Sequence, residues 1–146
     1  MDAAARSGGA VVILLVRHAS AGDRDAWQAD DRERPLDTYG RTQAKELVDR
    51  LAPYRIDAIL SSPAVRCIQT VAPLARARRL ELDVRKELGE KLQGTAGAEL
   101  LRSLATDDIV VVCGHSGLEQ VVPDAQGWGE GDTLVLGPGL EIQGAA

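Results

Sequence analysis

Phenylalanine is absent from this chain, aromatic residues make up only 3% of it, and cysteine and histidine occur twice each. With hydrophobic residues at 45% of 146 positions, leucine, valine, isoleucine and alanine have to build a core for about one domain. The lack of a CxxC pair, together with the two histidines, excludes a typical Cys/His zinc finger. Cys67 falls in a predicted helix and Cys113 in a predicted strand, so we expect two buried thiols in a reducing compartment.

An excess of positive charge and a long apolar run are also missing. The 22 acidic and 17 basic residues give a net charge of −5, which favours solubility and argues against a nucleic-acid-binding surface. The apolar run that ends before Arg17 is too short for a signal peptide with its cleavage site or for a membrane span. We therefore expect a cytoplasmic protein without a membrane partner. Residues 1–9 are small and polar and are predicted to be a loose tail before a single domain, residues 10–146.

Strand and helix patterns alternate along the chain. Short continuous apolar runs indicate buried strands, and apolar residues at i, i+3, i+4 and i+7 indicate helices. Strands are expected over residues 11–16, 56–60, 80–84, 109–113, 133–136 and 140–143, the last two as a terminal hairpin or edge pair. Helices are expected after residues 37 and 62 and over residues 96–104, with a short broken one at 118–126. This order predicts an α/β fold of three layers, a mostly parallel central sheet with helices on both faces.

Local signals indicate where two of these helices begin. Asp37 is placed to cap the helix that follows it. Ser62 followed by Pro63 is a second start signal, a cap followed by proline at the first helical position. Pro73 lies inside the pattern of that second helix and predicts a kink or break near residues 68–72.

Both histidines directly follow a predicted strand. His18 ends the first apolar run and has Arg17 before it, and His115 follows Gly114 after the run of residues 109–113. In open α/β sheets ligands bind just beyond the carboxyl ends of the strands. Two histidines in that position, one of them beside an arginine, predict a site for an anionic group.

Four segments resemble the histidine phosphatase superfamily, also called phosphoglycerate mutase-like, and they keep the family's order over about residues 10–120. They are an RHA variant of the RHG motif at 17–19, PLxxxGxxQA at 35–44, SSPxxRxxQT at 61–70 and GH at 114–115. The short length and the RHA variant are most similar to the SixA branch. They are also similar to the phosphatase domain that accompanies some Nudix hydrolases. No Nudix box is present, so any such partner would be a separate chain.

The resemblance implies a phosphatase that needs no metal or other cofactor and forms a covalent phosphohistidine at His18. A phosphoryl group in transfer requires cations around its oxygens and a nucleophile in line with the leaving group. Arg17 and Arg66 would supply planar forks for the phosphate, and His115 would add a donor across the pocket. Ser116 is predicted to be a turn residue that contacts the phosphate rather than a nucleophile.

Glu90 is the candidate general acid, because Leu88-Gly89-Glu90 matches the LxE segment in which mutases of the family keep their acidic residue. It could equally be a solvated loop glutamate, and an imidazole or pyrophosphate leaving group needs less help from an acid. Residues 19–35 show no clear period and are predicted to form a long loop over the site. Its three arginines, Arg24, Arg32 and Arg34, would be solvated or would form a rim for an anionic substrate.

Three alternatives for the function remain open. The chain lacks the insertions with which larger mutases build a lid, which predicts an open, shallow site and favours a SixA-like protein phosphohistidine phosphatase. The arginine-rich loop fits instead a phosphatase of nucleotides or sugar phosphates. A phosphate-binding regulatory module with little turnover is the third reading, and a mutase is less favoured than any of these. The expected partner is accordingly a phosphorylated protein or a small phosphate ester.

Overall fold

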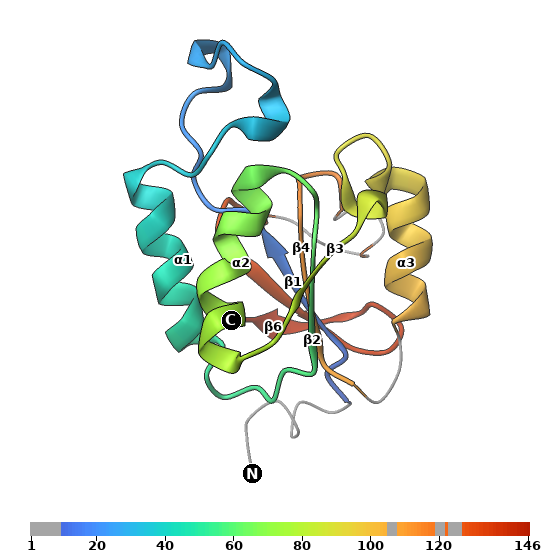
Figure 1. Cartoon of the computed structure of the whole chain (residues 1–146). Helices are drawn as coiled ribbons and strands as arrows, with labels where there is room; N and C mark the ends of the chain where they lie inside the picture. Colours follow the sequence, from blue (N-terminus) through green and yellow to red (C-terminus); the bar gives the residue numbers. More distant parts are fainter. Residues whose placement is uncertain (1–9, 105–107, 119–121, 123–126) are drawn as a thin grey trace.

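A computed structural model describes residues 10–104, 108–118, 122 and 127–146. Within these ranges, six strands form one mixed sheet in the order β3-β2-β4-β1-β5-β6 (Figure 1). The strands are β1 (Ile13–Arg17), β2 (Ala58–Ser61), β3 (Leu82–Val84), β4 (Val110–Gly114), β5 (Thr133–Leu136) and β6 (Ile142–Ala145). The strand at the centre, β4, pairs in parallel with both β1 and β2. The predicted terminal pair is confirmed, since β5 and β6 are antiparallel at one edge.

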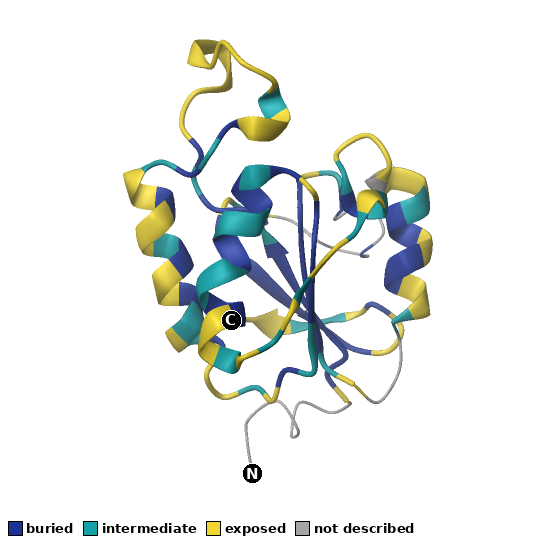
Figure 2. Ribbon diagram, viewed as in Figure 1, coloured by how far each residue is buried: buried dark blue, intermediate teal, exposed yellow. Residues whose placement is uncertain are grey.

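Helices cover both faces of this sheet. Helices α1 (Thr38–Arg50) and α2 (Val65–Arg78) lie on one face, and the short helix α3 (Ala98–Ser103) lies on the other (Figure 1). Figure 2 shows buried strands between helices whose outer surfaces are exposed. The predicted three-layer α/β fold with a parallel centre is therefore confirmed.

The alternation of side chains along β1 divides the core into two layers. Leu14 and Val16 belong to the cluster that packs under α1 and α2, whereas Ile13 and Leu15 belong to the cluster on the α3 side. All four side chains are fully buried. A continuous apolar run was therefore a correct sign of a strand covered on both faces.

The pairing of β1 with β4 places the ends of the two strands side by side. Arg17, the last residue of β1, lies opposite Gly114, the last residue of β4. The residues that follow, His18 and His115, therefore leave the same edge of the sheet next to each other. The backbone N–H of His18 donates to the carbonyl of Gly114 over 3.1 Å, which continues the pairing by one residue.

The predicted start of α1 is confirmed, and the predicted start of α2 is wrong. The carboxylate of Asp37 accepts a hydrogen bond from the backbone N–H of Gly40 over 2.7 Å, as an N-cap does. Helix α2 begins at Val65 with Ala64 in the cap position and no side-chain cap. Ser62 lies two residues earlier, where its hydroxyl is hydrogen-bonded to His115 and accepts from the backbone N–H of Ala64. The serine thus supports a histidine instead of capping a helix.

Of the kink or break predicted near residues 68–72, the break does not occur, because α2 is continuous from Val65 to Arg78, and the kink stays a prediction. A proline in a helix interior removes one hydrogen bond and costs about 3 kcal/mol. Val71 and Leu74, on either side of the proline, are fully buried in the cluster between α2 and the sheet. Burial of two such side chains stabilises the helix by about 3–6 kcal/mol, which is enough to offset that loss.

Two further sequence predictions concern the second half of the chain. The helix expected over residues 96–104 begins at Ala98 and is preceded by a π-helical turn, Gln93–Gly97. Most of the short helix expected over residues 118–126 lies outside the described residues. None of the helices in the described ranges is long and apolar enough to cross a bilayer.

Gly40 allows the chain after His18 to approach α1 closely. A Cβ atom at this position would overlap the backbone carbonyl oxygen of Ser20. Ser20 is fixed there by its hydroxyl, which donates to Asp37 over 2.7 Å, and by its N–H, which donates to the side chain of Gln43 over 2.8 Å. The backbone that leads away from His18 therefore packs directly on the first turn of α1.

We predict that Gly40→Ala destabilises the protein, although glycine-to-alanine in a helix ordinarily stabilises it by up to about 1 kcal/mol. The added methyl group meets backbone and not a flexible side chain, so a loss of about 1–3 kcal/mol in the free energy of unfolding is expected. Urea denaturation measures it, with Thr42→Ala on the exposed side of α1 as the control. Equal stability of Gly40→Ala and the wild type would show that Ser20 is free to move away.

Candidate active site

The two histidines of the chain lie against each other at the edge of the sheet. Their ring centroids are 5.5 Å apart and the rings meet edge to face. Both are buried, His18 with 6% and His115 with 2% of its surface exposed. The predicted pairing of the histidines is therefore present in the fold.

A hydrogen bond fixes which nitrogen of His18 carries the proton. Nδ1 lies 2.8 Å from the backbone carbonyl oxygen of Ala19. Because a carbonyl oxygen only accepts, Nδ1 is the protonated nitrogen of the neutral ring and Nε2 keeps its lone pair. The N–H of Ala19 donates in turn to the hydroxyl of Thr70 on α2 over 2.9 Å, which holds this backbone in place.

Burial lowers the pKa of His18 from 6.5 to about 4. The hydrogen bond to Ala19 raises the pKa in part, and the nearby charges of His115 and Arg66 lower it. His18 is therefore neutral at neutral pH, with Nε2 unprotonated. A neutral imidazole whose other nitrogen is anchored is suited to nucleophilic attack.

Arg66, in the first turn of α2, is a buried cation near this pair, with 1% of its surface exposed. Its Nη1 donates to the backbone carbonyl of Asp31 over 2.7 Å, and its Nη2 lies 3.0 Å from the carboxylate of Asp31. Glu90 is 3.6 Å from the same Nη2. The buried Nε has no hydrogen-bond partner among the described residues.

The structure places Arg17 and Ser116 differently from Arg66. The guanidinium of Arg17 donates to the backbone carbonyl of Trp128 over 3.0 Å, and its buried Nε has no hydrogen-bond partner in the described part of the chain. Ser116 is an exposed residue in the turn after His115. Neither residue lines the cavity described next, so their predicted contact with a phosphate stays a prediction.

Sequence reasoning missed the groups that hold His115. The hydroxyl of Ser62 lies 2.8 Å from Nε2 of His115, and the thiol of Cys67 lies 3.6 Å from the same nitrogen. Ser62 follows β2 as His115 follows β4, and the neighbouring residues Ser61 and Cys113 are in register. The rule that site residues follow strand ends would have identified Ser62. Both cysteines are free and buried, as predicted.

A cavity of about 710 Å³ opens beside these residues. Two loops and the end of the sheet line it, among others through Asp31, Ser62, Arg66, Lys86, Glu90, Lys91, Leu92 and His115. His18 is not part of this lining and is nearly covered. The site is therefore not uniformly open and shallow, because its predicted nucleophile is buried and is not exposed in this cavity.

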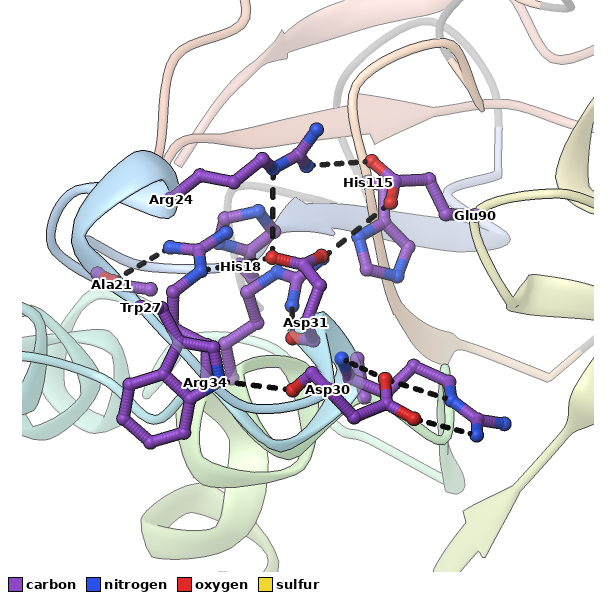
Figure 3. A network of polar contacts seen from close by, with 12 residues as sticks. His18, Ala21, Arg24, Trp27, Asp30, Asp31, Arg34, Glu90 and His115 are labelled. Atoms are coloured by element: carbon purple, nitrogen blue, oxygen red, sulfur yellow. Dashed lines mark hydrogen bonds and ion pairs between the residues drawn. The ribbon is translucent and has the colours of Figure 1, made fainter.

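Glu90 lines the cavity and forms an ion pair with the loop opposite. Arg24 reaches across to it with Nη2 over 3.0 Å and lies 3.5 Å from Asp31 (Figure 3). Burial raises the pKa of Glu90, but the hydrogen bond from Arg24 and the charges of His115, Arg24 and Arg66 leave it below 4.5. Glu90 is thus ionised at neutral pH. Its predicted role as general acid stays a prediction, with the location in favour and the protonation state against it.

The loop predicted over residues 19–35 contains two short 3-10 turns, Arg24–Ala26 and Asp31–Glu33, and projects beyond the end of β1 (Figure 1). Arg32 is exposed and pairs with Asp30, which agrees with a solvated arginine. For Arg34 that reading is wrong. It is buried, with Nη1 donating to the carbonyl of Ala21 over 2.6 Å and Nε donating to Asp31 over 3.1 Å. The guanidinium of Arg34 thus supplies the hydrogen-bond donor for a backbone carbonyl of its own loop.

Comparison with known protein families identifies the family to which the chain belongs. A sequence model described as "Histidine phosphatase superfamily (branch 1)" matches residues 13–108. The chain belongs to the histidine phosphatase superfamily. The resemblance to this family is thereby confirmed; three of the four motifs lie within the matched residues, and GH at 114–115 follows just after them.

Two relatives of this histidine phosphatase match it to different extents. An "8-oxo-(d)GTP phosphatase" of Mycolicibacterium smegmatis is 45% identical over 64 residues, which is 44% of this chain but only 20% of that protein. The chain thus spans a small part of that relative's length. An uncharacterized protein of Picosynechococcus sp. is 35% identical over 126 residues, 81% of this chain and 70% of the relative.

Solved structures of SixA proteins share the fold. The protein histidine phosphatase SixA in complex with tungstate superimposes with a TM-score of 0.71 at 20% identity and covers 88% of this chain and 90% of that one. The putative phosphohistidine phosphatase SixA from Agrobacterium tumefaciens gives a TM-score of 0.64 at 28% identity, over 86% and 90% of the two chains.

We predict that His18 of this histidine phosphatase remains neutral down to about pH 4. The unfolded chain takes up the proton near pH 6.5 and the folded chain does not, so the free energy of unfolding should fall as the pH drops between these values. Because the chain has two histidines, NMR titration of the imidazole signals can follow both, with His115→Gln as the assignment control. A His18 signal that titrates near pH 6.5 would contradict the burial argument.

Proposed function

We propose that this histidine phosphatase hydrolyses a phosphoramidate or phosphomonoester through a covalent phosphohistidine at His18, most specifically as a SixA-like protein phosphohistidine phosphatase. The observation that carries the proposal is the state of His18. The ring is neutral, its Nδ1–H is bound to Ala19, and the buried charge of Arg66 is near enough to help lower its pKa. This is the arrangement that an imidazole nucleophile for phosphorus requires.

The proposed reaction has two transfers. Nε2 of His18 attacks the phosphorus, the bond from phosphorus to the leaving group breaks, and a phosphohistidine forms. Water then attacks the same phosphorus, the P–N bond breaks, and inorganic phosphate and neutral His18 are restored. Arg66, Arg17 and His115 would stabilise the charge on the equatorial oxygens in both steps, with Ser116 as a further contact. These side chains supply the positive charge, so the scheme contains no metal and no cofactor.

The leaving group favours a phosphohistidine substrate. Transfer from one imidazole to another exchanges one P–N bond for a similar one, so the leaving nitrogen needs little help from an acid. An alkyl ester would need a proton donor at its oxygen, and Glu90 is ionised in the resting site. The free, buried thiols of Cys67 and Cys113 fit a reducing compartment, so we also propose that the protein acts in the cytoplasm.

His18→Ala should abolish turnover and leave the fold intact, because its side chain ends a strand and contributes little to the core. We expect an acid-labile phosphoryl label on the wild-type protein after rapid quenching during turnover of a phosphohistidine peptide, and none on the variant. Circular dichroism and thermal melting provide the fold control. Labelling that persists in His18→Ala would remove His18 as the nucleophile. Phosphate binding without label or hydrolysis in the wild type would point to a regulatory phosphate-binding module.

A nucleotide is the second candidate substrate, and two observations favour it. One relative carries the name 8-oxo-(d)GTP phosphatase. The cavity of about 710 Å³ also has the size of a small-molecule site, and Lys86 and Lys91 line it together with Arg66. These two lysines would supply positive charge for the further phosphates of a nucleotide.

The double variant Lys86→Gln/Lys91→Gln separates the two candidates. For a nucleotide phosphatase, we expect the KM for a nucleoside triphosphate to rise about threefold to tenfold, as is typical for exposed charge contacts, with kcat nearly unchanged. The KM for p-nitrophenyl phosphate should stay the same, since it has no second phosphate. Arg41→Gln/Lys45→Gln, on the exposed side of α1, removes the same two positive charges and controls for the change in net charge. An equal rise for both substrates would count against a subsite for the phosphate chain.

A further inference from the structure

Asp31 occupies the two terminal nitrogens of the arginine that the proposed function assigns to phosphate. Its backbone carbonyl accepts from Nη1 of Arg66 over 2.7 Å, and its carboxylate accepts from Nη2 over 3.0 Å. These are the two donors of a guanidinium that a phosphoryl group binds in the bidentate arrangement. A second bidentate group cannot use this same pair of N–H donors while Asp31 holds them.

The Asp31 carboxylate is a stable anion within a group of three arginines. Arg34 donates to it over 3.1 Å, Arg24 lies 3.5 Å away, and Arg66 contacts its other oxygen. Burial raises the pKa of Asp31, but the hydrogen bond from Arg34 and the charges of Arg66, Arg24 and Arg34 outweigh it and leave the pKa below 3.8. The group is therefore fully charged at neutral pH, as a substrate phosphoryl group also is.

The position of His18 points in the same direction. Arg66 and His115 line the cavity, whereas His18, 5.5 Å from His115, is only 6% exposed. Figure 3 shows Asp31 within the group of side chains that surrounds His18, with Arg24 linking it to Glu90. A phosphoryl group that approaches Arg66 from the cavity therefore meets this network.

We propose that Asp31 is an internal substitute for the phosphoryl group: it neutralises Arg66 in the resting site, is displaced when substrate binds, and returns when inorganic phosphate leaves. The proposal rests on the proposed function, in which Arg66 binds phosphate. A buried guanidinium without a counter-charge is costly. Exchange between Asp31 and phosphate means that Arg66 is paired throughout the cycle, and it limits the affinity for the product.

The displaced Asp31 keeps partners of its own. Arg34 lies on the same loop as Asp31 and remains bonded to it when Arg66 is given up. The tie between this loop and Glu90 is the Arg24 ion pair, whose two side chains are 59% and 43% exposed, and such pairs contribute little. The loop can therefore withdraw without leaving a buried charge unpaired.

A purely structural role for Asp31 predicts the opposite result. If its carboxylate serves to orient Arg66 for the substrate, its removal weakens phosphate binding. If it competes with the phosphate, its removal strengthens it. The sign of the change in affinity therefore decides between the two roles.

Calorimetric titration of inorganic phosphate into Asp31→Asn tests the proposal. The asparagine keeps the size of the side chain and the backbone carbonyl contact and removes the competing charge. We expect the Kd for phosphate to fall about tenfold, which corresponds to about 1.4 kcal/mol. Asp30→Asn is the matched control, because it makes the same charge change one residue away, where the carboxylate pairs with the exposed Arg32 and, among the described contacts, forms no hydrogen bond or ion pair with Arg66. Its Kd should stay within about twofold of the wild type, the range expected for loss of a solvated pair.

Steady-state inhibition gives a second readout. Phosphate should inhibit Asp31→Asn at lower concentration than the wild type, with a lower KM for p-nitrophenyl phosphate. An unchanged or higher Kd in Asp31→Asn, with an unaltered melting temperature, would overturn the proposal even if the enzyme hydrolyses its substrate through His18. A lower Kd in a protein that hydrolyses nothing would support the exchange at Arg66 and count against the proposed phosphatase. Absence of phosphate binding in both proteins would overturn the role of Asp31.

Discussion

The pairing of β4 between β1 and β2 is the constraint on which the site depends. Because all three strands run in parallel, their carboxyl ends meet at one edge, and the register brings together His18, His115 and Ser62, each the first residue after its strand. No side-chain interaction is needed to bring the histidines near each other, since the backbone ladder already does so. The buried side chains of β1 and β4 hold this ladder in place from both faces.

A second constraint follows from the burial of charge at that edge. Arg66 is fully inside the fold, and its charge adds to the burial that keeps His18 neutral. The same cation attracts Asp31 and Glu90, which come from two different loops. One buried guanidinium thus reinforces the neutral state of the imidazole and draws carboxylates to the entrance of the site.

Residues that follow strands could be predicted, because a continuous apolar run marks a strand and the next polar residue then lies at the sheet's edge. His18 and His115 were found in this way, and Asp37 was found as a cap from local sequence. Contacts between segments far apart in the chain could not be predicted from the sequence. Asp31 and Arg66 are 35 residues apart and no periodicity links them. Arg34 was misjudged for the same reason, since its burial depends on how the loop folds back on itself. The break that Pro73 could cause does not occur, because tertiary packing outweighs a local preference.

The two ends of the loop over the site are joined, and this affects which changes in the loop's sequence the protein can tolerate. The backbone N–H of Asp37 donates to the carbonyl of Ser20 over 3.1 Å, and the hydroxyl of Ser20 donates to the carboxylate of Asp37. The two ends of the intervening segment are therefore fastened to each other and to α1. The entropy of closing such an excursion grows only slowly with its length. We therefore expect the segment of residues 21–36 to tolerate insertions and deletions. Such changes can alter what enters the site while the strand ends beneath it keep their positions.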